Sequence, residues 1–225
     1  MYTDDPDFDA PGDNDLLWRY FDLARYLDLL IRERLFFSSV ENMEDPFEGW
    51  AMENGFRRNS EDQDRVVVSS WHSNEEENYA MWKIYAQGSA GLAIQTRFSR
   101  LRDAFHPTDK RVRIGKVVYY RGTGDMAGAA GESLLKPYLQ KRNIYAFEKE
   151  VRCCYRPEGN GNEQEVSEAP RGVYLSVDLD RLIERIYISP YAPEWFRQLI
   201  GGVNKKFGVK KEIVHSDVFG GRSDP

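Results

Sequence analysis

The sequence predicts an α+β fold, a single domain with a mostly antiparallel mixed sheet flanked by helices. Short segments typical of strands are mixed with helical segments, without the regular strand–helix–strand rhythm of a doubly wound parallel sheet. The chain has 225 residues, of which 41% are hydrophobic, enough for one substantial core or two small ones. No sequence period repeats, and no low-complexity linker divides the chain.

The strands are predicted from short runs of β-branched and aromatic residues bounded by turn residues. The clearest is VVVSSWHS at 66–73, which starts with three valines. RVRIGKVVYY at 111–120 alternates between apolar and polar residues, as a half-buried strand does. The predicted strands are 16–21, 35–40, 66–73, 91–96, 111–120, 148–155, 173–179, 184–190 and 210–216.

The helices are predicted from apolar spacing and from capping residues. Asp22 can cap a helix whose apolar face carries Leu23, Leu27, Leu30 and Ile31. A second helix follows a capping-box-like pair, Asn74 and Glu77, and ends at Gly88. Further helices are predicted over 98–105, 132–147 with a kink at Pro137, and 193–208.

The negative charge is concentrated at the N-terminus. The net charge is −6, and residues 1–15 contain six Asp and no Lys, Arg or Glu, so the remainder is near neutral. We expect a disordered acidic arm over 1–15, one domain over 16–219 and a flexible tail over 220–225. Neither a signal peptide nor a membrane-spanning run is evident, so we expect a cytoplasmic protein that does not bind membranes.

The segment YAFEKEVRCCY at 145–155 carries the most informative charges. On a strand, Glu148, Glu150 and Arg152 share one face, with the two carboxylates roughly 7 Å apart. Like charges that close can raise the pKa of one carboxyl group, which suits acid–base work or the stabilisation of a cation. A solvated strand face explains the same pattern, and the spacing alone favours that explanation.

Further polar residues could bind a ligand. Arg19, between Trp18 and Tyr20, could hold a phosphate or carboxylate, although a surface Arg on an edge strand is equally plausible. Ser69 and Ser70 end a strand and could orient a polar ligand, or could bond to nearby backbone.

Aromatic and acidic residues add two weaker candidates. Trp82 and Tyr85 could border a ring-binding pocket, but a core position explains them as well. Asp45 and Glu48 could bind a metal together with Glu148, although a capped turn at Pro46 is the commoner explanation. We expect no metal cofactor. The Lys205, Lys206, Lys210 and Lys211 cluster is better explained by a helix C-terminus than by nucleic-acid binding.

Three motifs together resemble a bacterial family classed as a domain of unknown function. They are EDPFEG at 44–49, MWKIYAQGSAGLAIQ at 81–95 and KRNIYAFEKEVR at 141–152. The family pattern is N-D-P-F-E, then M-W-x-x-Y, then K-x-x-x-W-x-x-E-x-E-x-R. Here Glu44 replaces the Asn and Tyr145 replaces the Trp. The similarity extends from about Trp18 to His215.

A more distant resemblance implies a chemistry. Arg on a first strand, hydroxyl residues ending a later strand and E-x-E-V on a late strand resemble the Arg–Ser–Glu class of ADP-ribosyltransferases, which includes bacterial toxins. The resemblance implies an ADP-ribosyltransferase-like fold with NAD as the substrate. By this resemblance, Arg19 would bind an NAD phosphate, and Ser69 or Ser70 would position the nicotinamide side. Glu150 would stabilise the ribosyl cation, and Glu148 would activate an acceptor.

Three hypotheses follow, in order of preference. The first is an ADP-ribosyltransferase-like or NAD-cleaving enzyme, such as a toxin or phage-defence effector, with catalytic Glu150 and Glu148. The residues that would bind its dinucleotide are Arg19, Ser69, Ser70, Trp82 and Tyr85. The sequence does not distinguish a protein acceptor from a nucleic-acid acceptor. The second is a non-catalytic module that binds a protein or a nucleic acid. The third is a metal-dependent hydrolase or nuclease.

Overall fold

The computed structural model describes residues 1–40, 43, 45, 66–86, 88–122, 133, 135–157 and 172–220. The contacts divide the chain into two compact units. The first unit consists of Met1–Pro11, Leu35–Trp71 and Phe105–Leu175. The second unit consists of Gly12–Arg34, His72–Ala104 and Ser176–Pro225. Strands and helices alternate irregularly in both, and the sheet is mostly antiparallel, which confirms the predicted α+β class.

The strands of the second unit follow the predicted segments closely. β1 (Leu16–Asp22) pairs antiparallel with β4 (Gly91–Arg97) along its whole length. β10 (Arg185–Ile188) pairs antiparallel with β4 on its other side, and β11 (Glu212–His215) runs parallel to β10. On the other side of β1, Leu17 and Trp18 pair with Ser73 and His72, the last two residues of β3.

The first two helices of the second unit begin at side-chain caps that the sequence supplies. α1 (Leu23–Arg32) starts after Asp22, whose carboxylate accepts a hydrogen bond from the Arg25 N–H, as predicted. α4 (Tyr79–Tyr85) is capped by Asn78 rather than by Asn74, because the Asn78 side chain accepts from the Ala80 and Met81 N–H groups. The others are α5 (Phe98–Ala104), α7 (Leu179–Leu182) and α8 (Glu194–Lys206), with a 3₁₀ turn η2 (Gly88–Ala90).

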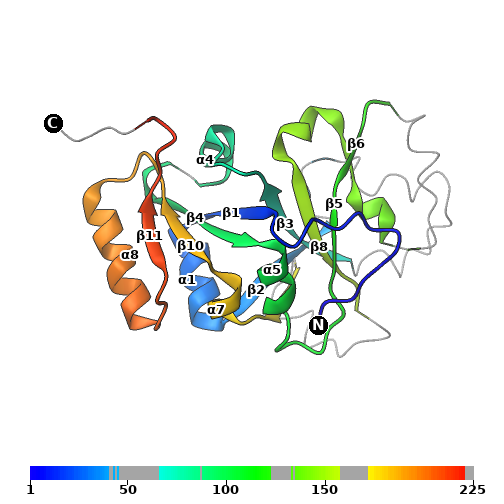
Figure 1. Ribbon diagram of the computed structural model, residues 1–225, viewed down its shortest axis with the longest axis horizontal. Coiled ribbons are helices and arrows are strands. Elements are labelled where there is room, and N and C mark those ends of the chain that lie inside the picture. Colours follow the sequence, from blue (N-terminus) through cyan, green and yellow to red (C-terminus); the bar gives the residue numbers. More distant parts are fainter. Residues whose placement is uncertain are drawn as a thin grey trace. The chain divides into compact units, whose positions relative to one another are not determined.

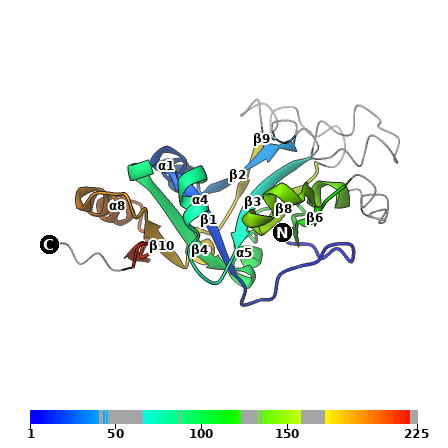
Figure 2. The same ribbon diagram turned by 90° about the horizontal axis from the view of Figure 1, so that it is seen from above.

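Aromatic side chains join α4 to one face of β1. Trp18 and Tyr20, two residues apart on β1, pack with Trp82 of α4, and the Tyr20 and Trp82 rings meet edge to face at 4.9 Å. Figure 2 shows α1 and α4 beside β1 and β4, and α8 lies beside β11 in Figure 1. This packing gives the second unit an aromatic core of its own.

The first unit is built around β3 (Val67–Ser73), which contributes Val67–Trp71 to it. β2 (Arg34–Ser39) pairs antiparallel with β3, and β9 (Gly172–Ser176) lies next to β2. β8 (Glu150–Tyr155) pairs with β3 and, antiparallel, with β5 (Arg113–Lys116). β8 therefore lies between two strands and is covered along both edges.

The segment expected as one kinked helix over 132–147 does not form an α-helix in its described part. It forms a 3₁₀ helix η4 (Lys136–Leu139), the strand β7 (Gln140–Arg142) and a second 3₁₀ helix η5 (Asn143–Glu148). β7 runs parallel to β6 (Val118–Tyr120). The prediction was wrong because Pro137 lacks an N–H to continue an α-helix, and because strand pairing with β6 takes up the following residues.

The N-terminal residues Met1–Pro11 belong to the first unit and pack within it. Tyr2 forms a parallel bridge with Val112, Asp5 is buried and 3.0 Å from the Arg113 guanidinium, and Phe8 belongs to the apolar core. Arg113 and Lys136 supply charges opposite to those of Asp5 and Asp7, and the disordered arm expected over 1–15 stays a prediction. The limits 16–219 of one domain stay a prediction, and residues 221–225 of the expected tail lie outside the described residues.

Among the residues that the structure describes, every helix is too short or too polar to cross a lipid bilayer.

Gly91 and Gly201 provide a matched test of packing in the second unit. A Cβ at Gly91 would overlap the carbonyl oxygen and Cβ of Ala86, whereas a Cβ at Gly201, inside α8, meets nothing within 4 Å. Gly91→Ala should therefore lower the free energy of unfolding by about 1–3 kcal/mol. Gly201→Ala should raise it by about 0.5–1 kcal/mol because alanine favours the helix. Urea unfolding of both variants checks this, and equal effects would contradict it.

Candidate functional site

Glu150 and Arg152 are buried at the start of β8, where the sequence left a solvated face open as an explanation. The exposed fractions are 5% for Glu148, 5% for Glu150 and 1% for Arg152. The solvated-face explanation is therefore wrong. Burial of charged side chains is costly unless each charge is paired and hydrogen-bonded, so the partners of these groups are the central question.

One face of the β3–β8 pair changes from apolar to polar along its length. Val66, Val68 and Cys154 belong to one apolar cluster, so they lie on the same face. By strand alternation, Ser70 of β3 and Glu150 of β8 continue that face. The Ser70 hydroxyl donates a hydrogen bond to the Glu150 carboxylate. Ser70 is exposed, so this hydrogen bond joins a buried carboxylate to a side chain that solvent reaches.

Arg152 holds Glu150 in a two-pronged ion pair. Its Nε lies 2.7 Å from Oε1 of Glu150, and its Nη2 lies 2.9 Å from Oε2. Its Nη1 donates to the carbonyl oxygen of Tyr138 at 2.6 Å. Fork-to-fork pairs of this kind fix orientation as well as charge. Glu150 therefore has a single, well-defined side-chain position.

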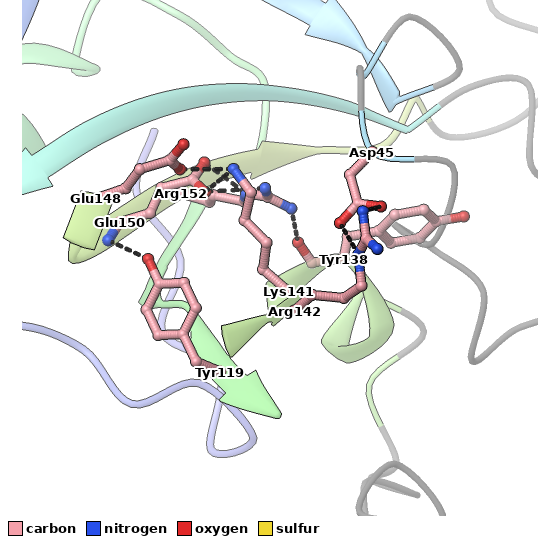
Figure 3. A network of polar contacts seen from close by, with 8 residues as sticks. All are labelled: Asp45, Tyr119, Tyr138, Lys141, Arg142, Glu148, Glu150 and Arg152. Atoms are coloured by element: carbon pink, nitrogen blue, oxygen red, sulfur yellow. Dashed lines mark hydrogen bonds and ion pairs between the residues drawn. The ribbon is translucent and has the colours of Figure 1, made fainter. Parts of the chain in front are cut away.

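Lys141 of β7 bridges the two glutamates (Figure 3). Its Nζ lies 2.6 Å from Oε2 of Glu148 and 3.3 Å from Oε2 of Glu150, and 4.7 Å from the ring centre of Tyr145. Two carboxylates, one ammonium and one guanidinium leave the cluster with no net charge. A neutral, fully bonded cluster is the form in which a buried ionic group is tolerated.

The register of β6 and β7 directs these side chains. Tyr119 pairs with Lys141, and Tyr120 pairs with Arg142. Because neighbours on a strand point to opposite faces, Lys141 and Tyr119 reach Glu150 while Arg142 points away from it. The Glu150 N–H donates to the Tyr119 hydroxyl oxygen at 2.8 Å. Burial, opposed by that hydrogen bond, raises the pKa of Tyr119 to about 12.

Glu148 and Glu150 converge although only one of them is on a strand. β8 begins at Glu150, whereas Glu148 ends η5, so the prediction that both lie on one strand was wrong. Between them Lys149 takes a left-handed conformation with φ of 41°, which is costly for a residue with a side chain. That turn brings both carboxylates to the Lys141 ammonium.

Arg142 connects this cluster to another motif of the sequence. Its guanidinium lies 2.9 Å from a carboxylate oxygen of Asp45, which is buried. Asp45 comes from EDPFEG and Arg142 from KRNIYAFEKEVR, so two of the three motifs meet in the first unit (Figure 3). The sequence left open a metal site formed by Asp45 and Glu48 together with Glu148. In the structure, Asp45 pairs with Arg142 and Glu148 pairs with Lys141. Glu48 lies outside the described residues, and elsewhere no three His, Cys, Asp or Glu side chains are grouped for a metal.

The environment keeps Glu150 ionised. Burial alone would raise its pKa, but the Arg152 guanidinium, the Lys141 ammonium and the Ser70 hydroxyl together lower it to about 2 from an ordinary 4.5. The carboxylate is therefore charged throughout the physiological range. A fixed, buried negative charge is the kind of group that can stabilise a positive charge forming nearby.

The remaining predicted site residues are placed as follows. Ser69 is buried and points to the face of β3 opposite Ser70. Arg19 lies in the second unit, with its guanidinium 5.6 Å from the ring centre of Phe21, on the face of β1 opposite Trp18 and Tyr20. Trp82 and Tyr85 pack on the Trp18–Tyr20 side. The structure thus brings Ser70, Glu148 and Glu150 together, and separates Arg19 from the α4 aromatics across β1.

Trp82 has a packing role in the second unit. Its side chain is 1% exposed, and its indole N–H donates to a Glu77 carboxylate oxygen at 2.9 Å. Tyr85 is half-buried beside it. Trp82 therefore satisfies its polar atom within the chain, as a core residue does.

Sequence reasoning missed Lys141, Tyr119 and Arg142. Lys141 and Arg142 fell inside the segment that was expected to be helical, where a Lys and an Arg suggest a solvated face. The available signal was the fixed spacing within KRNIYAFEKEVR, in which two cations precede two carboxylates and an arginine follows them. The concentration of six charged residues in these twelve indicates an ionic cluster more specifically than the Glu-x-Glu pair alone.

Comparisons with known proteins give a limited result. No protein-family model matches the chain, and no curated protein matches it. Among solved structures, the chain is similar to Thermus sp. 2.9 DarT in complex with NAD⁺, with 9% identity, a TM-score of 0.44, and coverage of 92% of this chain and 96% of that one. The same protein in complex with carba-NAD⁺ gives 9% identity, a TM-score of 0.42, and coverage of 92% and 97%.

Loss of the Glu150 charge should lower the free energy of unfolding strongly near neutral pH and less in acid. Glu150→Gln leaves Arg152 and Lys141 without their shared partner, so it should lower the free energy of unfolding by about 3–5 kcal/mol at pH 7. The folded-state pKa lies below the ordinary 4.5, so the stabilisation by Glu150 is present above pH 4.5 and disappears towards pH 2. Urea unfolding of both proteins should show the difference shrinking as the pH falls from 7 to 3.

Glu184→Gln is the matched control for this measurement. Glu184 pairs with Arg97 at 3.2 Å, but the pair is partly exposed. Its loss should cost about 1 kcal/mol or less. An equal cost for the two substitutions, or a cost at Glu150 that does not change with pH, would contradict the description of the cluster.

Proposed function

We propose that this protein is an ADP-ribosyltransferase-like enzyme that cleaves NAD and passes the ADP-ribosyl group to an acceptor or to water. The observation that carries the proposal is the hydrogen bond from exposed Ser70 to buried, ionised Glu150. It joins, in one unit, two of the three residue types that the resemblance to the Arg–Ser–Glu class requires. A purely structural cluster would not require this hydrogen bond, because Lys141 and Arg152 already balance the charges of the two carboxylates.

The chemistry suits a fixed carboxylate. When the bond between the ribose C1′ and the nicotinamide nitrogen breaks, its electron pair leaves with neutral nicotinamide, and positive charge develops on the ribose. An acceptor hydroxyl or a water molecule then adds to C1′ and loses a proton. A negative charge held in a low-dielectric site stabilises that positive charge without having to reorganise. Glu150 is proposed for this role.

Ser70 is proposed as the residue that presents Glu150 to the substrate. It is the exposed partner of the carboxylate, so a ligand that reaches the Ser70 hydroxyl is also next to Glu150. The sequence left the choice between the two serines open, and Ser70 is proposed here because Ser69 points to the opposite face of β3. NAD fits this pair as a substrate with hydroxyl groups on the reacting ribose.

The wider roles remain expectations from the sequence. Arg19 as the phosphate-binding residue, a cytoplasmic location, and a toxin or phage-defence role are parts of the same proposal. The acceptor is left as a protein, a nucleic acid or water. The binding-module hypothesis is the alternative to be accepted if NAD is not turned over.

Replacement of Ser70 tests the proposal without disturbing the ion pairs. Ser70→Ala should slow nicotinamide release from NAD by about tenfold, which is the effect of losing one hydrogen bond to a charged group in the transition state. Ser69→Ala is the matched control on the opposite face of the same strand and should leave the rate within about twofold. Chromatographic measurement of nicotinamide at saturating NAD checks both.

Glu150→Gln gives the stronger test where the variant stays folded at the assay temperature. Loss of the charge that faces the ribose should reduce nicotinamide release by about 10²–10³-fold. Thermal unfolding of each variant separates loss of activity from loss of structure. Undiminished release by folded Glu150→Gln, or a larger effect of Ser69→Ala than of Ser70→Ala, would refute the proposed site.

A further inference from the structure

The Glu150 carboxylate has no acceptor capacity left in this arrangement. An ionised carboxylate offers about four lone-pair positions. Arg152 takes two of them through Nε and Nη2, Lys141 takes one, and the Ser70 hydroxyl takes one. A ribose hydroxyl can therefore reach Glu150 only if one of these four donors moves away.

Of the two cationic side chains that donate to Glu150, Lys141 makes the longer contact. Its contact with Oε2 is 3.3 Å, compared with 2.7 Å and 2.9 Å for the two contacts from Arg152. Arg152 is also anchored by the Tyr138 carbonyl oxygen at 2.6 Å, so it would give up three well-formed bonds by moving. Lys141 would give up one long contact.

Glu148 supplies the partner that Lys141 keeps. Its Oε2 lies 2.6 Å from Lys141 Nζ, closer than the 3.3 Å between that nitrogen and Glu150 Oε2. Glu148 is itself buried, and the left-handed turn at Lys149 fixes its position relative to Glu150. The ring of Tyr145, 4.7 Å away, gives the ammonium a second favourable contact on the same 3₁₀ helix.

We propose that Glu148 is a positioning residue that retains the Lys141 ammonium, so that Lys141 releases Glu150 when a ribose hydroxyl binds there. This inference rests on the proposed NAD-cleaving function and deepens it. It also assigns Glu148 a role other than activating the acceptor, which the resemblance implies, because the Glu148 Oε2 atom is already engaged by the Lys141 ammonium at 2.6 Å.

Among the described residues, the groups that face this exchange come from several elements around Glu150. They are Ser70 of β3, Tyr119 of β6, Lys141 of β7, Tyr145 and Glu148 of η5, and Arg152 of β8. Lys141 contacts both carboxylates, so it can transfer its interaction from one carboxylate to the other. Glu148 determines which of the two it favours.

A double-mutant cycle tests this role. In Glu148→Gln, Lys141 loses its preferred partner and should move fully onto Glu150. The kcat for nicotinamide release should then fall about tenfold or more, while KM for NAD changes by less than about threefold. In the double variant Glu148→Gln with Lys141→Met, nothing competes for Glu150, and kcat should recover to within about threefold of the wild-type value.

The recovery distinguishes the positioning role from a direct one. If Glu148 activated the acceptor itself, the double variant would remain as slow as Glu148→Gln, and the inference would be wrong. Wild-type kcat in Glu148→Gln together with loss of turnover in Glu150→Gln would also overturn it, while leaving the proposed function standing. Normal turnover in Glu150→Gln would instead remove the proposed function itself.

A crystal structure of Glu148→Gln gives a readout that does not depend on activity. The distance from Lys141 Nζ to Glu150 Oε2, 3.3 Å in the wild-type protein, should shorten to about 2.8 Å, the length of a full charge-assisted hydrogen bond. An unchanged or longer distance would show that Glu148 does not determine the position of Lys141.

Discussion

The ion pair between Glu150 and Arg152 is the interaction on which the rest of the first unit depends. Two charges this deeply buried are tolerated only when their remaining hydrogen-bonding positions are filled. That requirement accounts for the Tyr138 carbonyl oxygen turned towards Arg152 and for the Lys141 ammonium beside Glu150. The parallel pairing of β6 with β7 then becomes understandable, because it places Lys141 on the face where the cluster lies.

The same cluster creates a conflict between stability and chemistry. A carboxylate that is fully bonded is stable, but it cannot bind a substrate hydroxyl without losing a donor. Among the contacts of Glu150 with the two cations, the longest belongs to Lys141, which has a second carboxylate to retain it. The second glutamate is therefore not redundant: it allows one contact to be released without leaving a buried ammonium unpaired.

The sequence predicted the strands better than the links between them. VVVSSWHS, GLAIQT and the Asp22 cap were recognisable because their patterns are local. Glu150 and Ser70 were identified as candidates for the same reason. Burial of Glu150 was not predictable, because it depends on β5, β6 and β7 meeting β8 from distant parts of the chain. The turn at Lys149 was missed because nothing in the residue type favours a left-handed conformation there.

The spacing of KRNIYAFEKEVR follows from these contacts. Adjacent Lys141 and Arg142 must diverge, one to Glu148 and Glu150 and the other to Asp45, and strand alternation achieves this in two residues. The six residues of η5 then bring the chain back so that Glu148 reaches the lysine seven positions before it. Every charged residue of the motif that has been placed in the cluster thus has a partner inside the first unit. The motif by itself is explained by stability, and the proposed chemistry depends on Ser70, the exposed hydroxyl that lies outside it. A chain that retained the motif but lacked this hydroxyl would keep the charge cluster and lose the exposed side chain through which a substrate is proposed to reach Glu150.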